Sequence, residues 1–166
     1  MAAQTSPATN DTSKMVGRSV VLEYCITPAA GENTKPIDSD WKPAGAMRTK
    51  AFDFKPNTVT SEADDEGGFP ETLVTNSEFS LSGEGEFRKK DKTTEIGINA
   101  LVDLYVKAIT ARKQPRVWVR LNYGSIVVEG KLVITELSTE APTNDLVTFS
   151  VGFGVGESST LSITVK

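Results

Sequence analysis

Polar and apolar side chains alternate one by one along several stretches of the chain. Such alternation is typical of a strand with one face on a core and the other in water. The clearest stretch covers residues 78–87. Its polar face is acidic or hydroxyl-bearing: Glu78, Ser80, Ser82, Glu84 and Glu86. Its other face is apolar or small: Phe79, Leu81, Gly83, Gly85 and Phe87. We therefore predict a half-buried strand here.

The same alternation predicts further strands along the chain. They cover residues 18–27, 47–54, 116–122, 125–137 and 146–155, with a short terminal strand at 161–165. In the 146–155 strand we expect Val147, Phe149, Val151 and Phe153 to point inward, and Thr148, Ser150, Gly152 and Gly154 outward. Pro56 is expected to end the 47–54 strand. The strands at 47–54 and 78–87 would then form a hairpin bridged by a long loop at 56–75.

One segment has helical spacing instead. Its apolar residues recur at steps of one, three and four positions, which gives the stripe of an amphipathic helix: Ile96, Ala100, Leu101, Leu104, Tyr105, Ala108 and Ile109. We predict a single helix over about 93–111, capped at its start by Asp91 or Thr93 and followed by Pro115. With many strands, 13 glycines and 8 prolines, the chain is expected to be mainly β.

The length of 166 residues suits one domain with arms. Residues 1–15 are polar and lack aromatic side chains, so we expect a flexible arm or tail. Residues 16–156 would form the β-rich domain, and residues 157–166 a C-terminal arm with the short strand. The chain contains no run of about 18 apolar residues, so we expect no membrane span. Since residues 1–15 lack the pattern of a secretion signal, we expect the protein in a cytoplasm.

The residue types argue against catalysis. The chain has no histidine, the commonest general base and metal ligand. Its one cysteine, Cys25, lies in an apolar run and is expected to be a buried core residue. No glycine pattern suits a bound nucleotide. We therefore expect a protein that is not an enzyme and carries no cofactor or metal.

Charge is unevenly distributed along the chain. All charged residues between 57 and 86 are acidic, whereas basic residues gather around and after the predicted helix. This asymmetry favours a subunit with an acidic and a basic side, suited to head-to-tail stacking. The adjacent Asp64, Asp65 and Glu66 raise the possibility of a calcium or magnesium site, but their spacing fits no EF-hand loop. We prefer a solvated acidic loop.

The order of these parts resembles the major tail tube protein of long-tailed bacteriophages with non-contractile, siphovirus-like tails. The resemblance lies in a polar N-terminal arm, a first strand at 16–27, a hairpin with an oversized acidic loop, and one helix at 93–111. The closest match is the C-terminal hairpin over residues 127–156.

The resemblance implies a β-sandwich or partial barrel flanked by one helix. Six copies would form a ring, and their long hairpins would join into a continuous β-barrel around a channel. Stacked rings would form the tail tube of the virion, a conduit for DNA during genome ejection. Its partners would be other copies of itself, other tail proteins and passing DNA without specific binding, with no membrane. Assembly would take place in the host cytoplasm.

Two groups of residues follow as site hypotheses. A lumen wall should be small or acidic, because phosphates bind basic surfaces; we expect it to include Glu78, Ser80, Ser82, Glu84, Glu86, Thr148 and Ser150. The long loop would reach the next ring and order only on stacking. Its inter-ring residues would be Glu62, Asp64, Asp65, Glu66, Phe69 and Glu71.

Two alternatives remain from the sequence. A β-sandwich binding module for a sugar or protein would need an exposed aromatic platform, for which Trp41, Trp118 and Tyr123 are the candidates. The other is the tube protein of a contractile tail or secretion system, which would have the same kind of fold.

Overall fold

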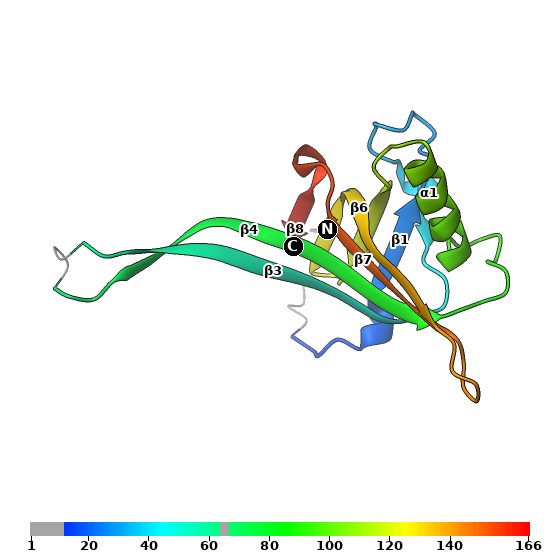
Figure 1. The fold of residues 1–166 in the computed structure, drawn as a ribbon, viewed down its shortest axis with the longest axis horizontal. Coiled ribbons are helices and arrows are strands. Elements are labelled where there is room, and N and C mark those ends of the chain that lie inside the picture. The colour runs from blue at the N-terminus through cyan, green and yellow to red at the C-terminus, as the bar shows by residue number, and fades with distance from the viewer. Residues whose placement is uncertain (1–11, 64–66) are drawn as a thin grey trace, which may run out of the picture.

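An antiparallel sheet of eight strands dominates the structure, a computed structural model that describes residues 12–63 and 67–166 (Figure 1). The strands are β1 (Val21–Cys25), β2 (Lys42–Pro43), β3 (Met47–Ser61), β4 (Glu71–Glu86), β5 (Arg116–Asn122), β6 (Ile126–Glu140), β7 (Thr148–Val155) and β8 (Ser162–Val165). The helix is α1 (Ile98–Thr110), and short 3-10 turns cover Gly17–Ser19, Asp38–Asp40 and Ser158–Thr160. The alternating segments thus form strands, as predicted.

The strand order is β2-β1-β5-β6-β7-β4-β3, and β8 also pairs with β6. The long β6 strand connects two parts of this sheet. Its first half pairs with β5 and β8, and its second half pairs with β7. A register shift between Ile134 and Glu136 marks a bulge, which bends the strand where it changes partner.

The sheet curls until its distant strands meet around one core. The rings of Tyr24 on β1 and Phe153 on β7 lie 5.6 Å apart between centroids. Near the other margin, the hydroxyl of Tyr123 donates a hydrogen bond to the carbonyl of Lys50 on β3, at 3.1 Å. The curled sheet remains open, so the architecture is the partial barrel with one flanking helix that the resemblance implied.

The buried residues follow the predicted alternation. Within β4 the residues Phe79, Leu81, Gly83 and Gly85 are buried, while the intervening side chains are exposed or, for Glu86, half-buried. The main cluster collects residues from β1, β4, β5, β6, β7 and α1, among them Leu22, Leu81, Val119, Leu132, Phe153 and Leu101. Burial of this apolar surface is the main force that holds the curled sheet together.

The segment 26–43 covers the outer face of the sheet over β1, β5 and the first half of β6. Trp41 and Trp118 pack together with Cys25 and are buried. Lys131 is only 5% exposed, and its ammonium group donates to the carbonyl of Glu32 at 3.1 Å. The predicted burial of Cys25 is confirmed, and neither tryptophan is available as an exposed aromatic platform.

The helix begins later than predicted, at Ile98. The carboxylate of Asp91 accepts hydrogen bonds from the backbone N–H of Ala100 and from the side chain of Asn99, both at 2.9 Å. Asp91 therefore satisfies a free donor of the first turn from outside the helix. A side chain at Gly97 would overlap this carboxylate, so the tight approach needs glycine there.

The expectation of a long loop at 56–75 is wrong for most of that segment. β3 continues to Ser61 and β4 starts at Glu71, so the two strands form a hairpin that projects far from the body (Figure 1). Pro56 lies opposite Ser77 within this ladder. Proline is tolerated because β3 is an edge strand, where its missing N–H costs no hydrogen bond when it faces away from β4.

The two ends of the chain differ from each other. Residues 12–16 have no regular structure and are exposed; the rest of the predicted N-terminal arm lies outside the described residues. The terminal strand is present as β8, which pairs with β6 over Ile126–Glu129. Residues 162–165 are thus part of the sheet and not a free arm.

Candidate functional site

Four neighbouring strands present one continuous polar face. They are β3, β4, β7 and the second half of β6, and paired residues on adjacent strands point to the same side. One row crosses all four strands through Ala51, Ser82, Gly152 and Glu136, and the next through Thr49, Glu84, Ser150 and Ser138. We call this surface the acidic face; its carboxylates are Asp53, Glu78, Glu84, Glu86, Glu136 and Glu140.

The residues predicted for the lumen wall lie together on the acidic face. Glu78, Ser80, Ser82 and Glu84 are exposed, and the others are half-buried: Glu86, Thr148 and Ser150. Glu136, Ser138 and Glu140 of β6 also lie on this face and were not predicted from the sequence. The bulge before Glu136 shifts the alternation there. The sequence does contain a sign of this bulge, because the inward residues Ile134 and Leu137 are three positions apart, whereas regular alternation would separate them by an even number.

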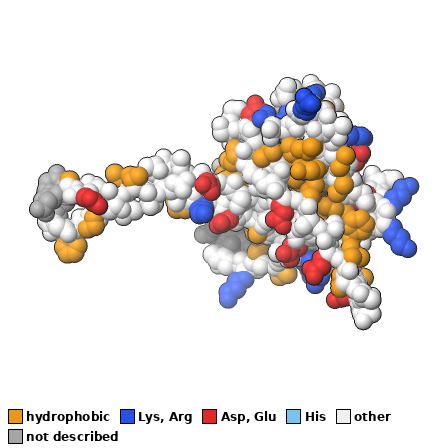
Figure 2. Space-filling view, in the orientation of Figure 1, with side chains coloured by type: hydrophobic (Ala, Val, Ile, Leu, Met, Phe, Trp, Pro, Cys, Tyr) orange, Lys and Arg blue, Asp and Glu red, His pale blue; other side chains and the backbone are white. Residues whose placement is uncertain are grey.

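The acidic face carries few compensating cations. Lys55 is the cross-strand partner of Glu78, and Arg48 Nε lies 3.9 Å from a carboxylate oxygen of Glu86. Both side chains of this ion pair are largely exposed, so water screens it strongly. The face therefore keeps an excess of negative charge. Acidic side chains are visible over the strands around the hairpin root (Figure 2).

Both sides of the acidic face end in strand edges. Among the described residues, no strand pairs with β3 on its outer side, and none pairs with β6 beyond Ile134 on the side away from β7. Unpaired backbone N–H and C=O groups on such edges can pair with strands of another chain. The acidic face can therefore be extended from both sides.

The projecting hairpin is the second candidate surface. It exposes the apolar side chains of Val59, Phe69, Leu73 and Val74, and Figure 2 shows apolar and acidic groups near its end. Glu62 and Glu71 lie beside the turn. Of the predicted inter-ring residues, Asp64, Asp65 and Glu66 lie outside the described residues. An isolated two-stranded hairpin is only marginally stable in water, so this segment needs a neighbour.

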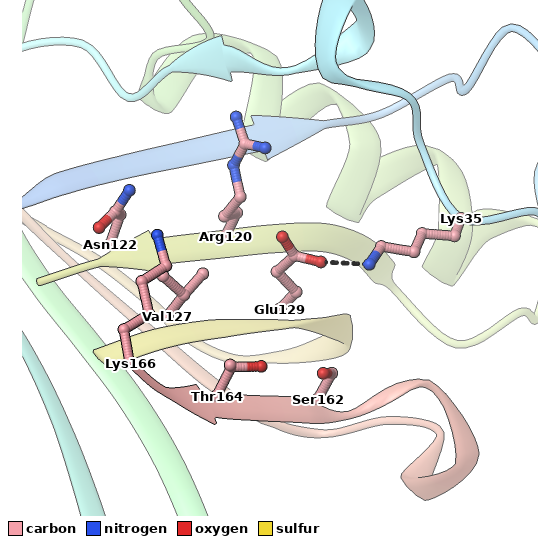
Figure 3. A pocket seen from close by; sticks show the side chains of 8 residues that line it. All are labelled: Lys35, Arg120, Asn122, Val127, Glu129, Ser162, Thr164 and Lys166. Carbon is pink, nitrogen blue, oxygen red and sulfur yellow. Dashed lines mark ion pairs between the residues drawn. The ribbon is translucent and has the colours of Figure 1, made fainter. Parts of the chain in front are cut away.

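A polar hollow of about 370 Å³ lies on the outer side of β5, β6 and β8 (Figure 3). Most of its charged groups have partners. Lys35 pairs with Glu129, and Arg120 pairs with Glu23, both at 2.6 Å. Burial lowers the pKa of Arg120, but its hydrogen bonds to Glu23 and Asp38 outweigh this and raise it overall. Lys166 also lines the hollow, and its ammonium group forms no ion pair within the described residues.

The described residues also hold no gathering of three carboxylate or thiol side chains that could bind a metal ion. No helix among residues 12–63 and 67–166 is long and apolar enough to cross a membrane.

No family model matches the chain, and no curated protein matches it in sequence. Solved structures do match it. The tail of an empty gene transfer agent (GTA) particle with C6 symmetry has a TM-score of 0.63 at 16% identity, over 92% of this chain and 100% of the other. The SPP1 tail tube has a TM-score of 0.57 at 13% identity, over 92% and 80%. The six-fold symmetrised baseplate of the anti-feeding prophage (AFP) has 0.60 at 8%, over 93% and 97%.

These similarities extend over nearly the whole chain. They include two particle tails or tubes and one baseplate, all of low sequence identity. The predicted fold, mainly β with one flanking helix and similar to that of phage tail tubes, is thereby confirmed. The chain has the fold of tail tube subunits.

Proposed function

We propose that this protein is the structural subunit of a phage tail tube, built from stacked rings of six copies around a channel for DNA. The observation that carries the proposal is the acidic face with a free strand edge on each side. The GTA tail and the SPP1 tail tube share the fold, and the former was determined with C6 symmetry. The protein would belong to the tail of a virion, assemble in the host cytoplasm and contact other tail proteins.

Ring closure would use the two free edges. The outer edge of β3 in one copy would pair with residues 135–140 of β6 in the next. Repeated around a ring, this contact joins the acidic faces into one β-barrel and leaves no edge exposed. Such a head-to-tail contact closes into a ring when its rotation fits the number of copies.

The joined acidic faces would line the channel. Glu78, Glu84 and Glu86 would then repel the phosphates of passing DNA. Small residues such as Ser82 and Gly152 would project little into the channel. The proposed role requires no catalysis, cofactor or membrane. It agrees with a chain that lacks histidine.

Two alternatives can now be compared with this proposal. A binding module with an aromatic platform has little support, because Trp41 and Trp118 are buried and Tyr123 is tied to the carbonyl of Lys50. The tube of a contractile system remains the second candidate, since the AFP baseplate shares the fold at a TM-score of 0.60. A sheath protein that binds the assembled tubes would favour that candidate.

Negative-stain electron microscopy of the purified protein at increasing concentration tests the proposal. We expect rings or tubes with a central channel and six-fold end views. Analytical ultracentrifugation on the same samples should show the loss of monomer as they appear. A protein that stays monomeric at high concentration would contradict the proposed function and favour a binding module.

A further inference from the structure

The helix α1 carries an apolar stripe that its own subunit leaves uncovered. Val102, Tyr105, Val106 and Ile109 are exposed and recur at intervals of three, one and three residues, which places them on one side of the helix. Val106 is 54% exposed. The neighbouring side of the helix packs into the core through Leu101 and Leu104, and Ile98 buries only the N-terminal end of the stripe. The apolar surface of α1 is therefore wider than the body can bury, and such a patch indicates a contact with another chain.

The end of the projecting hairpin also exposes apolar side chains, and it carries acidic ones beside them. We call Val59, Phe69, Leu73 and Val74, together with Glu62 and Glu71, the hairpin tip. Phe69 is 83% exposed. Aromatic side chains with this exposure are costly in water and are frequent anchors of protein interfaces. The hairpin tip thus combines apolar contact area with negative charge.

The charges around the two surfaces are complementary. The C-terminal end of α1 carries Lys107, Arg112 and Lys113. Lys107 pairs with Asp103 at 2.6 Å, whereas Arg112 and Lys113 form no ion pair within the described part of the chain. The hairpin between residues 57 and 86 has no basic residue at all. Opposite charges beside two apolar surfaces steer and orient their association.

The two surfaces cannot meet within one subunit. In Figure 1 the hairpin tip and α1 lie at opposite ends of the long axis of the molecule. Two copies arranged head to tail can bring them together, and the arrangement repeats without limit along a tube.

We propose that the hairpin tip of one subunit docks on the apolar stripe of α1 in a subunit of the neighbouring ring. This inference rests on the proposed function, because it presupposes stacked rings. It identifies the surface that receives the hairpin, and it explains why both apolar surfaces remain open in a single copy. Docking would also stabilise a hairpin that has no other support.

Disulfide cross-linking tests this contact. Leu73 and Val74 are consecutive in a strand and point to opposite faces of the hairpin, so two variants are needed: Leu73→Cys/Val106→Cys and Val74→Cys/Val106→Cys. After mild oxidation of assembled tubes, one of them should give a ladder of covalent multimers on a non-reducing gel. A ladder is expected because every chain carries both halves of the contact. The native Cys25 is buried, and burial and the charge of Asp40 raise the pKa of its thiol, which keeps it unreactive.

The matched control places the second cysteine at another exposed apolar site. Leu73→Cys/Ile163→Cys and Val74→Cys/Ile163→Cys use β8 in place of α1, and Ile163 is also exposed. These variants should stay monomeric on the gel. If tubes form but neither α1 variant gives a ladder, or if the β8 controls give an equal one, the docking site is wrong.

Reversing the charges on both sides of the contact tests the docking site if a cysteine variant does not assemble. Glu62→Lys/Glu71→Lys should abolish tubes and leave rings, and adding Arg112→Glu/Lys113→Glu should restore tubes. Tubes that are lost and not restored would overturn the docking site. The proposed function fails differently: the wild-type protein would then form neither rings nor tubes, whereas a wrong docking site leaves wild-type tubes intact.

Discussion

At the residue scale, Tyr24 stands out in the core. Its side chain is 1% exposed and packs against Phe153, yet its hydroxyl has no hydrogen-bond partner among the described residues. A buried polar group without a partner costs stability. Burial also raises the pKa of Tyr24, because the low-dielectric core disfavours the phenolate.

We expect the Tyr24→Phe substitution to preserve or raise the stability at pH 7, by up to about 1 kcal/mol, because it removes an unpaired hydroxyl. The pH dependence should change as well. In the unfolded chain the phenol ionises near pH 10, whereas the folded protein holds it neutral. The contribution of neutral Tyr24 to stability is therefore complete below about pH 10 and is lost as the pH rises further.

Urea unfolding at pH 7 and above pH 10 measures both effects. The Tyr24→Phe variant should lose less stability between the two pH values than the wild type. Tyr105→Phe, on the exposed side of α1, serves as the control and should behave like the wild type. A loss of more than about 1 kcal/mol at pH 7 in Tyr24→Phe would mean that the hydroxyl has a partner in solution.

At the scale of elements, the β3–β4 hairpin would decide how the subunit reaches beyond the proposed ring. Its outer part projects away from the body (Figure 1), and its exposed side chains include Val59 and Leu73. Asn57 and Asn76 face each other across the ladder and share a side-chain hydrogen bond at 2.7 Å. A two-residue turn can therefore close the hairpin at this point.

We expect replacement of residues 58–75 by an Asn-Gly turn, which suits a two-residue hairpin, to leave the body intact. Its stability should stay within about 0.5 kcal/mol of the wild type, as is usual for changes at exposed positions. Rings should still form, but tubes should be lost, because the segment that reaches the next ring is missing.

Urea unfolding checks the body of this variant, and electron microscopy checks the assembly. A variant that folds normally and still builds long tubes would show that the hairpin is not needed for stacking. Loss of rings together with tubes would instead place the hairpin in the contact within a ring.

At the scale of the whole molecule, the acidic face would give the wall of the proposed channel its negative charge. Reversal of Glu84 and Glu86 to lysine in each copy would place basic groups along the wall. We expect tubes of the Glu84→Lys/Glu86→Lys variant to form normally and to bind DNA, in a manner that weakens as salt rises. In a virion, the same change should slow genome ejection.

Binding of a short DNA duplex to assembled tubes, measured at low and high salt, tests this expectation. Glu32→Lys is the matched control, since Glu32 is exposed on the loop that lies over Trp118 and Lys131 and not over the strands of the acidic face. Its tubes should behave like the wild type. Loss of polymerisation in the Glu84→Lys/Glu86→Lys variant would place these residues at a subunit contact and not in the lumen.

Much of this molecule could be predicted from local pattern. Alternation identified the β4 faces around Leu81 and Glu84, because the direction of a side chain in a strand repeats every second residue. Helical spacing identified α1, although its start at Ile98 depends on a hydrogen bond that the backbone N–H of Ala100 donates to Asp91, nine residues earlier. The outward acids of β4 were found in the same way.

The extent of the hairpin was not predictable by the same means. Residues 56–61 and 71–75 are mostly polar and begin with Pro56, which favours a loop when strands are judged one at a time. They become a ladder because β3 and β4 continue a register that is already set in the body. The hydrogen bonds that stabilise each of these segments come from the partner strand and not from its neighbours in the chain.

The sequence by itself determined the strands, their inward and outward faces, the helix and the separation of acidic from basic segments. Only the tertiary structure decided which strands lie side by side. The bend of β6 brings Glu136 and Glu140 beside β7, and the loop 26–43 buries Trp41 and Trp118. The reason is physical: a side chain's direction follows from its neighbours in the chain, whereas pairing and burial depend on contacts between segments far apart in it.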